Sequence, residues 1–352
     1  MASVARIPII DISGDIQDEA QVAKELVEAA IEHGFIYIKN TGRDIPVATV
    51  DDAFDLAKKL FRAPLEEKQK CTIQQNNRGW SAMQYETLDP KNQRVGDFKE
   101  AFNFGEFVDG KAQQLIPETI AEHESQISAF RDLCYEMCLK INTLLGIGLE
   151  VDPPSFFTDA HLRSKGPSGT ILRLLYYPPL TSTTASAAED VRAGAHSDYG
   201  SLTMLFRLAG QAGLEILTRD NTWAPVPVLP PGTEDDAAPP ILVNIGDLLS
   251  YWTNGLLRST VHRVVFPGDK GSLVEGETDK EPRYSIAYFC HPVGSMPLTL
   301  VPSERVRAFA GAGAEVVEGN PYAERKVLTA NEHLHMRLRA SYLQLYKDNA
   351  TE

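Results

Sequence analysis

Apolar residues in the first half of the chain recur at the spacing of amphipathic helices. Between about residues 120 and 145 they return at every third or fourth position, which places them on one helical face. The same period predicts helices at about residues 19–33 and 47–61. Short apolar runs at 7–12 and 35–38 flank the first helix and have strand character. The pattern therefore predicts a strand, helix and strand, followed by helices that cover a sheet.

Beyond residue 170 the helical period gives way to short apolar or alternating runs. Clusters of Pro, Gly and Asp separate these runs, which is typical of the many short strands of a sandwich or barrel. The predicted strands cover residues 171–177, 202–208, 214–217, 241–244, 260–266 and 284–289. Segments rich in small, polar, charged or Pro residues predict loops at 181–190, 230–240 and 268–282.

These two patterns together predict one α+β domain. The chain has 352 residues, of which 43% are hydrophobic, so it has enough apolar material for a core. It shows no internal repeat and no linker that would divide it. We therefore expect a single unit over residues 1–352, with a helix-rich region at 1–165, a β-rich core at 166–300 and a strand and helix region at 301–352.

The charge of the chain limits its partners. A formal net charge of −14 disfavours nucleic acid and anionic membranes, because neutralising phosphates requires clustered Lys and Arg. No stretch approaches the roughly 20 apolar residues of a membrane span, and the first residues lack the apolar segment of a secretion signal. We expect a small-molecule substrate, no nucleic-acid or membrane partner, and a monomer or weak homodimer.

The four cysteines are too few and too irregularly spaced for a disulfide framework or a zinc cluster. Cys134 and Cys138 are four positions apart in a helical pattern, where cysteines usually serve as small buried apolar residues. This usage fits a reducing compartment, and we expect the protein to be cytoplasmic.

A candidate metal site begins with His196 and Asp198, which are separated by one residue. If both lie in a strand, their side chains share a face and can reach one ion. His262 lies in a later predicted strand and is the candidate third ligand. Two histidines and one carboxylate with open positions are the ligand set of non-heme iron(II) oxygenases. The His196 and Asp198 spacing alone is weak evidence for a metal site, so the interpretation depends on the motifs near it.

A second candidate site lies in the predicted strand at 284–289. Alternation places Arg283 and Ser285 on one face, where a guanidinium and a hydroxyl can bind the distal carboxylate of a 2-oxo diacid. In the strand at 171–177, Tyr177 can donate to the same carboxylate. Arg173 then points into the same cavity, where it needs an acceptor, either the substrate or a structural carboxylate. Arg192 is a further substrate candidate, with a solvated ion pair to a neighbouring acid as the alternative.

Eight motifs spread over nearly the whole chain carry a family resemblance. They are IPIID at 7–11, GFIYIKN at 34–40, RGW at 78–80, DFKE at 97–100, GAHSDYG at 194–200, VNIGD at 243–247, WTNG at 252–255 and STVHRV at 259–264. On these motifs the chain resembles the isopenicillin N synthase-like 2-oxoglutarate oxygenases. That family includes plant flavonoid and gibberellin oxidases and fungal enzymes such as thymine hydroxylase.

The resemblance implies a distorted double-stranded β-helix, or jelly roll, flanked by N-terminal helices. It also implies the role of each matched residue, namely metal ligands at His196, Asp198 and His262, 2-oxoglutarate ligands at Arg283, Ser285 and Tyr177, and substrate contacts at Arg173, Tyr199 and Phe289. The chain departs from the family at Leu175, where an asparagine is usual. We expect this change to affect the seating of co-substrate or substrate and to leave metal binding unaltered.

The implied activity is an oxidation that depends on Fe(II), 2-oxoglutarate and O2, with ascorbate as a candidate reductant. Hydroxylation of a small organic molecule, a natural-product intermediate or a nucleobase, is the expected outcome, with release of succinate and CO2. Three alternatives stay open on the sequence. The first is an iron-dependent oxidase that needs no 2-oxoglutarate, the second a ligand-binding protein without turnover, and the third a zinc hydrolase, in which Arg283 and Ser285 would have no purpose.

Overall fold

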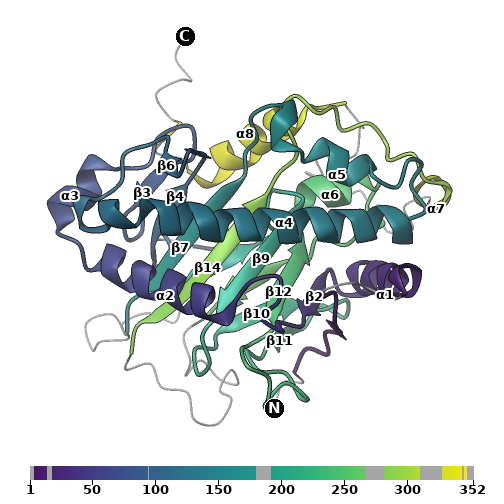
Figure 1. The fold of residues 1–352 in the computed structure, drawn as a ribbon, viewed down its shortest axis with the longest axis horizontal. Helices are drawn as coiled ribbons and strands as arrows, with labels where there is room; N and C mark the ends of the chain where they lie inside the picture. The colour runs from purple at the N-terminus through teal and green to yellow at the C-terminus, as the bar shows by residue number, and fades with distance from the viewer. Residues whose placement is uncertain are drawn as a thin grey trace.

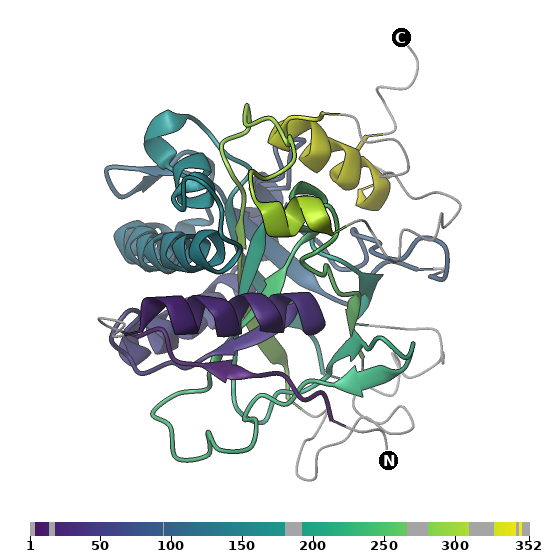
Figure 2. The ribbon, with the colours of Figure 1, turned by 90° about the vertical axis from the view of Figure 1, so that its right-hand side faces the viewer.

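The computed structural model describes residues 4–13, 18–93, 95–179, 192–265, 281–309, 327–342 and 345–346. Within these ranges the chain forms a layer of helices, a large sheet and a smaller sheet. Helices α1 (Glu19–Glu32), α2 (Val47–Phe61) and α4 (Glu124–Gly148) lie across one face of the large sheet (Figure 1). Figure 2 shows these layers edge-on.

The large sheet has eight strands in the order β1, β2, β12, β9, β14, β7, β4, β3. All neighbours pair antiparallel except β1 and β2. In chain order the strands are β1 (Ile9–Ile10), β2 (Phe35–Ile38), β3 (Gly79–Ser81), β4 (Glu100–Phe104), β7 (Ile171–Tyr177), β9 (Leu202–Arg207), β12 (Ile241–Ile245) and β14 (Arg283–Cys290).

The smaller sheet faces the side of the large sheet that the helices leave open. Its strand order is β11 (Trp223–Pro225), β10 (Leu214–Leu217), β13 (His262–Val264) and β8 (Ala193–His196). A separate hairpin joins β5 (Phe107–Val108) to β6 (Lys111–Ala112). Two facing sheets, antiparallel except for the β1 and β2 pair, with helices on one side confirm the predicted α+β class.

Strand β7 shows why the sheet is covered on both faces. Leu172 and Leu174 belong to the core between the sheet and the helices, while Leu175 and Tyr177 belong to the core between the two sheets. Because side chains alternate along a strand, one strand serves both layers. Arg173 shares the inner face and therefore enters the space between the sheets, as the sequence predicted.

Shorter helices complete the fold. They are α3 (Leu65–Lys70), α5 (Phe156–Ala160), α6 (Asp247–Trp252), α7 (Glu304–Ala308), α8 (Ala330–Ser341) and two 3₁₀ turns at Glu118–His123 and Arg163–Lys165. Helix α8 begins with a capping box, in which the Thr329 hydroxyl and the Glu332 carboxylate each accept from the other residue's backbone N–H. This cap fixes where α8 starts, beside the open end of the two sheets.

Most predicted elements are confirmed within a few residues. The prediction differs at 120–145, where a 3₁₀ turn precedes α4, and at 260–266, where only the three residues of β13 pair as a strand. The described part of 301–352 contains two helices and no named strand. The loop prediction at 181–190 lies outside the described residues, as does most of 268–282.

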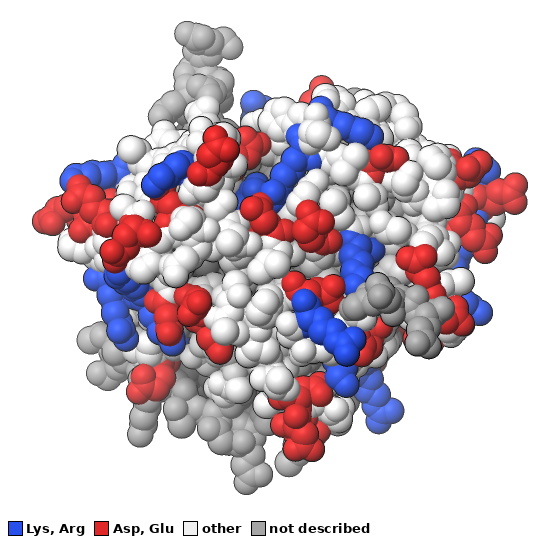
Figure 3. Space-filling model, viewed as in Figure 1, with Lys and Arg blue, Asp and Glu red and all other residues white. Residues whose placement is uncertain are grey.

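The described surface carries mixed charge. Figure 3 shows acidic and basic side chains interspersed over the helical face, without a continuous basic area among the described residues of that face. Both signs side by side give no field that would gather polyanions there. None of the described helices is long and apolar enough to cross a bilayer. All four cysteines are free and buried, so Cys134 and Cys138 have the structural setting predicted for them.

Gly34 lies between α1 and β2 and packs closely against the segment that precedes β13, and we expect alanine there to be strongly destabilising. Its φ is +67°, and an added Cβ would lie 2.2 Å from the Arg258 carbonyl oxygen and 2.5 Å from the Thr260 hydroxyl. Positive φ costs roughly 1–2 kcal/mol for an L-residue, and overpacking adds about 1–3 kcal/mol. Gly34→Ala should therefore lower the free energy of unfolding in urea by about 3 kcal/mol or more.

Gly210→Ala is the matched control, because Gly210 also has positive φ (+75°) but no atom within 4 Å of the added Cβ. We expect a loss of only about 1 kcal/mol there. Equal losses in the two variants would show that the close approach at Gly34 carries no energetic weight.

Candidate metal centre and co-substrate pocket

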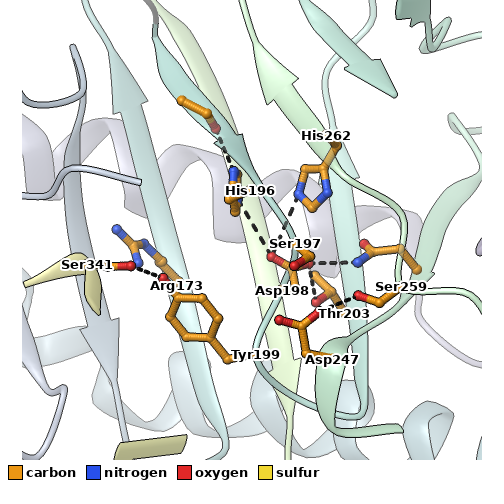
Figure 4. A network of polar contacts seen from close by, with 12 residues as sticks. Arg173, His196, Ser197, Asp198, Tyr199, Thr203, Asp247, Ser259, His262 and Ser341 are labelled. Carbon is orange, nitrogen blue, oxygen red and sulfur yellow. Dashed lines mark hydrogen bonds and ion pairs between the residues drawn. The ribbon is translucent and has the colours of Figure 1, made fainter. Parts of the chain in front are cut away.

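His196, Asp198 and His262 converge on one point between the two sheets. One ligand atom from each lies within 4.8 Å of the other two. The Asp198 Oδ1 atom is 3.8 Å from the His196 Nε2 atom and 3.7 Å from the His262 Nε2 atom. Figure 4 shows both imidazoles directed at this carboxylate. Among the described residues this is the one group of three His, Cys, Asp or Glu side chains that could hold a metal ion.

Backbone carbonyls fix the proton on each imidazole. The Nδ1–H of His196 donates to the Gly194 oxygen at 2.7 Å, and the Nδ1–H of His262 donates to the Thr260 oxygen at 3.1 Å. A carbonyl only accepts, so Nδ1 must carry the proton and Nε2 keeps its lone pair. Both imidazoles therefore present an unprotonated nitrogen to the central point, as a metal ligand requires.

The Asp198 carboxylate is held in one orientation. Its Oδ2 atom accepts from the Thr203 hydroxyl at 2.6 Å and from the Asn244 amide at 2.7 Å. These bonds leave Oδ1 facing the two histidines. Asn244 belongs to the VNIGD motif that the sequence singled out without giving it a role.

His196 and Asp198 do not converge by alternation along one strand, as the sequence predicted. Strand β8 ends at His196, so Asp198 lies beyond the strand and not on its alternating face. The pairing of β8 with β13 also shifts register between its two paired positions. Such an irregularity re-aims side chains near the end of a strand. The convergence of His196 and Asp198 thus depends on the turn after β8.

The electrostatics of the group suit a divalent cation. Burial, followed by the nearby His262, lowers the pKa of His196 to about 3. Burial alone would raise the pKa of Asp198, but the two histidines and the Thr203 and Asn244 donors hold it below its ordinary value. A buried carboxylate beside two neutral imidazoles has negative charge and three free donor atoms, and such a set favours an ion such as Fe(II).

Arg283 lies deeper in the same space, at the start of β14. It is 3% exposed, and its Nε–H donates to the Ala212 oxygen at 2.9 Å. Its guanidinium also lies 4.8 Å from the Tyr177 ring centre and 3.5 Å from the Ser285 hydroxyl. No described carboxylate lies within ion-pair distance of Arg283.

This buried cation therefore lacks a described counterion. Burial first, and then the positive charges of Arg192 and Arg207, lower the pKa of Arg283 to about 10. A buried unpaired charge costs several kcal/mol, so an anionic ligand would relieve the cost. The Arg283, Ser285 and Tyr177 cluster is therefore suited to a carboxylate.

One cleft connects the metal group to the Arg283 cluster. It encloses about 950 Å³ of space that is partly open to solvent. The side chains on the inner face of β14 all line it, as alternation predicted, at Arg283, Ser285, Ala287 and Phe289. Leu175 lines the cleft opposite Ser285 in the β7 to β14 pairing, so the position where the family usually has asparagine is apolar here.

The other end of the cleft contains a buried charge network that the sequence did not predict. The Arg173 guanidinium donates to both oxygens of Glu86, at 3.3 and 2.5 Å. Lys99 donates to Glu86 at 2.9 Å and to Asp97 at 2.5 Å. Asp97 in turn accepts from the Gly194 N–H at 3.0 Å, two residues before His196. The acceptor that Arg173 was predicted to need is thus Glu86.

Helix α8 closes the same end of the cleft. Leu334 and Leu338 line it, together with Tyr342 just beyond the helix. Arg337 donates to Asp247 at 2.8 Å and lies 5.1 Å from the Tyr199 ring centre. Helix α8 is therefore attached to the start of α6 and to the turn after β8, which carries Asp198.

Nine of the ten predicted site residues line this cleft, and Arg192 does not. Those that do are Arg173, Tyr177, His196, Asp198, Tyr199, His262, Arg283, Ser285 and Phe289. Arg192 is buried, 2% exposed, outside the lining of the cleft. The residues missed by the sequence are Glu86, Lys99, Thr203, Asn244, Leu334, Leu338 and Tyr342. Lys99 lies in the DFKE motif and Asn244 in the VNIGD motif, so these two motifs are the only sign in the sequence that the two residues belong to the site.

Comparison with known protein families identifies the family of this chain. The family model for the 2OG-Fe(II) oxygenase superfamily matches residues 168–292. The model for the N-terminal region of the non-haem dioxygenase in morphine synthesis matches residues 7–123. The chain belongs to the 2-oxoglutarate and iron(II) oxygenase family. The enzyme is thus a 2-oxoglutarate-dependent dioxygenase that uses Fe(II), 2-oxoglutarate and O2, and its fold is the double-stranded β-helix.

Individual relatives support this placement of the enzyme. A UPF0676 protein of Schizosaccharomyces pombe is 36% identical and covers 91% of both chains. The 2-oxoglutarate-dependent dioxygenase htyE of Aspergillus rugulosus is 31% identical and covers 82% of this chain and 89% of its own. A full-length Neurospora crassa protein, solved in complex with alpha-KG and thymine, is 27% identical, covers 97% and 99% of the two chains, and has a TM-score of 0.74.

The hydrogen bonds to Asp198 predict the metal affinity of two variants. Thr203→Val and Asn244→Leu each remove one donor to Oδ2 and free the carboxylate to rotate. Loss of a group that orients a metal ligand typically weakens metal binding about 10 to 100-fold. We expect a loss of about that size for each variant in a titration of the apo-enzyme with Mn(II).

Thr143→Val on α4 is the matched control, because its hydroxyl donates to the Leu139 carbonyl far from the cleft. Its Mn(II) affinity should equal that of the wild type. Unchanged affinity in both Asp198-contacting variants would contradict the orienting role.

Proposed function

We propose that the enzyme oxidises a C–H bond of a small organic molecule, with Fe(II) held by His196, Asp198 and His262. The distal carboxylate of 2-oxoglutarate is held by Arg283 and Ser285, with Tyr177 beside them. The observation that carries this assignment is the arrangement within one cleft: three convergent donor atoms, and a buried guanidinium without a described counterion. When bound, Fe(II) with 2-oxoglutarate and O2 supplies the oxidising chemistry and leaves succinate and CO2.

The protein side chains contribute position and shielding. Thr203 and Asn244 hold Asp198 so that one oxygen faces the metal position. The Arg283 fork fixes the far end of the co-substrate by two parallel hydrogen bonds, which sets the direction in which its oxo acid group points. Leu334 and Leu338 of α8 cover the substrate end with apolar surface and limit the access of water.

An oxidase that needs no 2-oxoglutarate is the second candidate from the sequence. Such an enzyme could use Arg283 for a carboxylate on its substrate. The relatives favour the first function, because htyE is a 2-oxoglutarate-dependent dioxygenase and the Neurospora crassa protein was solved with alpha-KG bound. We therefore assign Arg283 to the co-substrate and the Arg173 end of the cleft to the substrate.

The substrate proposed here is a natural-product intermediate or a nucleobase. The support is the likeness to the Neurospora crassa protein, whose solved complex contains thymine, and to fungal dioxygenases. Arg173, Tyr199 and Phe289 border its position, and Arg192 is left out because it does not line the cleft. Hydroxylation is the proposed outcome.

We further propose that residues 1–352 act as one unit in the cytoplasm, as a monomer or weak homodimer. Four free buried cysteines suit a reducing compartment. A mixed-charge helical face suits a protein that does not bind polyanions.

The assignment is tested by binding before turnover. Isothermal titration of 2-oxoglutarate into the Mn(II)-loaded protein should show one site per chain, and succinate release under air with Fe(II) should rise when a substrate from a compound screen is present. Turnover of an accelerating compound without 2-oxoglutarate, or the absence of 2-oxoglutarate binding, would sink the proposal.

Arg283→Gln should weaken 2-oxoglutarate binding at least about 100-fold. The variant loses two charge-assisted hydrogen bonds of roughly 1.5–3 kcal/mol each, and about 1.4 kcal/mol corresponds to a factor of ten. Mn(II) affinity should stay at the wild-type value, because Arg283 does not contact the metal ligands.

Arg219→Gln serves as the control, because the Arg219 side chain is exposed and donates to backbone carbonyls at the end of α1. Its affinity for 2-oxoglutarate should not change. A 2-oxoglutarate affinity in Arg283→Gln equal to that of the control would place the co-substrate elsewhere.

A further inference from the structure

We propose that the substrate end of the cleft selects an uncharged, carbonyl-bearing molecule, and that Glu86 sets this preference by neutralising Arg173. The inference rests on the proposed function, since it takes Arg283 for the co-substrate. Glu86 acts through Arg173 and is therefore a positioning residue. The preference predicted by an inward arginine alone would be the opposite, a substrate with a carboxylate.

The charges at this end of the cleft balance. Arg173 and Lys99 supply two positive charges, and Glu86 and Asp97 supply two negative charges within 2.5 to 2.9 Å of them. All four side chains are buried, with at most 9% exposed. The network is neutral as it stands, so an anionic substrate would add an uncompensated buried charge.

The ion pairs around Glu86 persist at neutral pH. Burial alone would raise the pKa of Glu86, but the Arg173 and Lys99 charges hold it well below its ordinary range. Burial alone would lower the pKa of Lys99, but Asp97 and Glu86 raise it. Glu86 is therefore ionised and Lys99 is protonated when the enzyme works.

Arg173 has one hydrogen-bond donor without a described partner. The Nε–H of Arg173 is buried and has no hydrogen-bond partner among the described residues, although the other two nitrogens of the guanidinium are engaged. A buried N–H without an acceptor costs about 1–3 kcal/mol, so a neutral acceptor such as a carbonyl oxygen would relieve the cost without changing the charge. An amide, lactam, imide or ketone meets this requirement.

Aromatic and apolar side chains form most of the walls around Arg173. Tyr199 and Tyr342 flank it, and the Tyr199 hydroxyl is bonded to the Ser341 hydroxyl of α8 (Figure 4). Most other lining side chains are apolar, at Leu88, Ile171, Leu205, Phe289, Leu334 and Leu338, and Asn77 and His291 add two neutral polar groups. Apolar and aromatic walls with few polar groups favour a flat or largely apolar body with one carbonyl directed at Arg173.

The Arg283 end of the cleft provides the contrast within the same molecule. Of the three Lys and Arg side chains that line the cleft, Arg173 and Lys99 have carboxylate partners, whereas Arg283 has none among the described residues. The cleft therefore has one position built for an anion and one built for a neutral ligand.

The test compares matched probes in ligand-observed NMR. A panel of aromatic carboxamides and their isosteric carboxylates, benzamide and benzoate among them, is titrated into protein saturated with Mn(II) and 2-oxoglutarate. The wild type should bind the carboxamides at least about tenfold more tightly than the paired carboxylates. A wild type that prefers carboxylates, shows no preference or binds no carboxamide would overturn the proposal, and this arm needs no variant.

Glu86→Gln should reverse the preference. The change leaves Arg173 with a positive charge that Glu86 no longer balances, so carboxylate affinity should rise by roughly a hundredfold relative to the carboxamides, from a tenfold disadvantage to a tenfold advantage. The double variant with Arg173→Gln removes that charge again and should lose the gain. Such a sign change is not expected from a merely structural disturbance.

Glu100→Gln is the matched control, because Glu100 also pairs with a buried lysine, Lys68, at 2.9 Å but does not line the cleft. Its probe preference should equal that of the wild type. Glu86→Gln must keep wild-type affinity for 2-oxoglutarate, and failure of the wild type to bind 2-oxoglutarate would count against the proposed function alone. A Glu86→Gln variant that binds 2-oxoglutarate normally without any change in probe preference would overturn the role of Glu86.

Discussion

The buried carboxylate of Asp198 is the group on which the rest of the site depends. Two donors, Thr203 and Asn244, take one of its oxygens, and the other oxygen faces two imidazoles whose protons are held away by backbone carbonyls. A negative charge buried beside neutral nitrogens is costly until a cation arrives. The fold supplies this arrangement from β8, the turn after it and β13, so the binding of the metal compensates a charge that the fold has already buried.

The same rule of charge compensation divides the cleft into two ends. Arg283 is buried without a described carboxylate partner, which suits an anionic co-substrate. Arg173 is buried against Glu86, with Lys99 shared between Glu86 and Asp97, which suits a neutral substrate. The two arginines come from adjacent strands, β14 and β7, and they differ in that carboxylates surround Arg173, whereas Arg283 has the positive charges of Arg192 and Arg207 nearby.

The sequence predicts best where chemistry demands a residue type at a fixed spacing. The Arg283 and Ser285 pair could be found because alternation along β14 carries the geometry, and the helices and strands because their apolar period is strong. The His196 and Asp198 pair could be found from its residue types and close spacing, although the turn after β8, and not alternation, brings the two side chains together. Glu86 could not be found, since it reaches Arg173 across 87 positions from a loop without a periodic pattern. The turn that aims Asp198, and the attachment of α8 over the cleft, depend in the same way on tertiary packing.

The most direct measurement is anomalous diffraction from crystals grown without oxygen in the presence of Fe(II) and 2-oxoglutarate. The account predicts one strong iron peak per chain, bound by the Nε2 atoms of His196 and His262 and by the Oδ1 atom of Asp198, with the co-substrate carboxylate against Arg283. An iron peak at any other group of side chains, or an iron position without one of these three ligands, would contradict it.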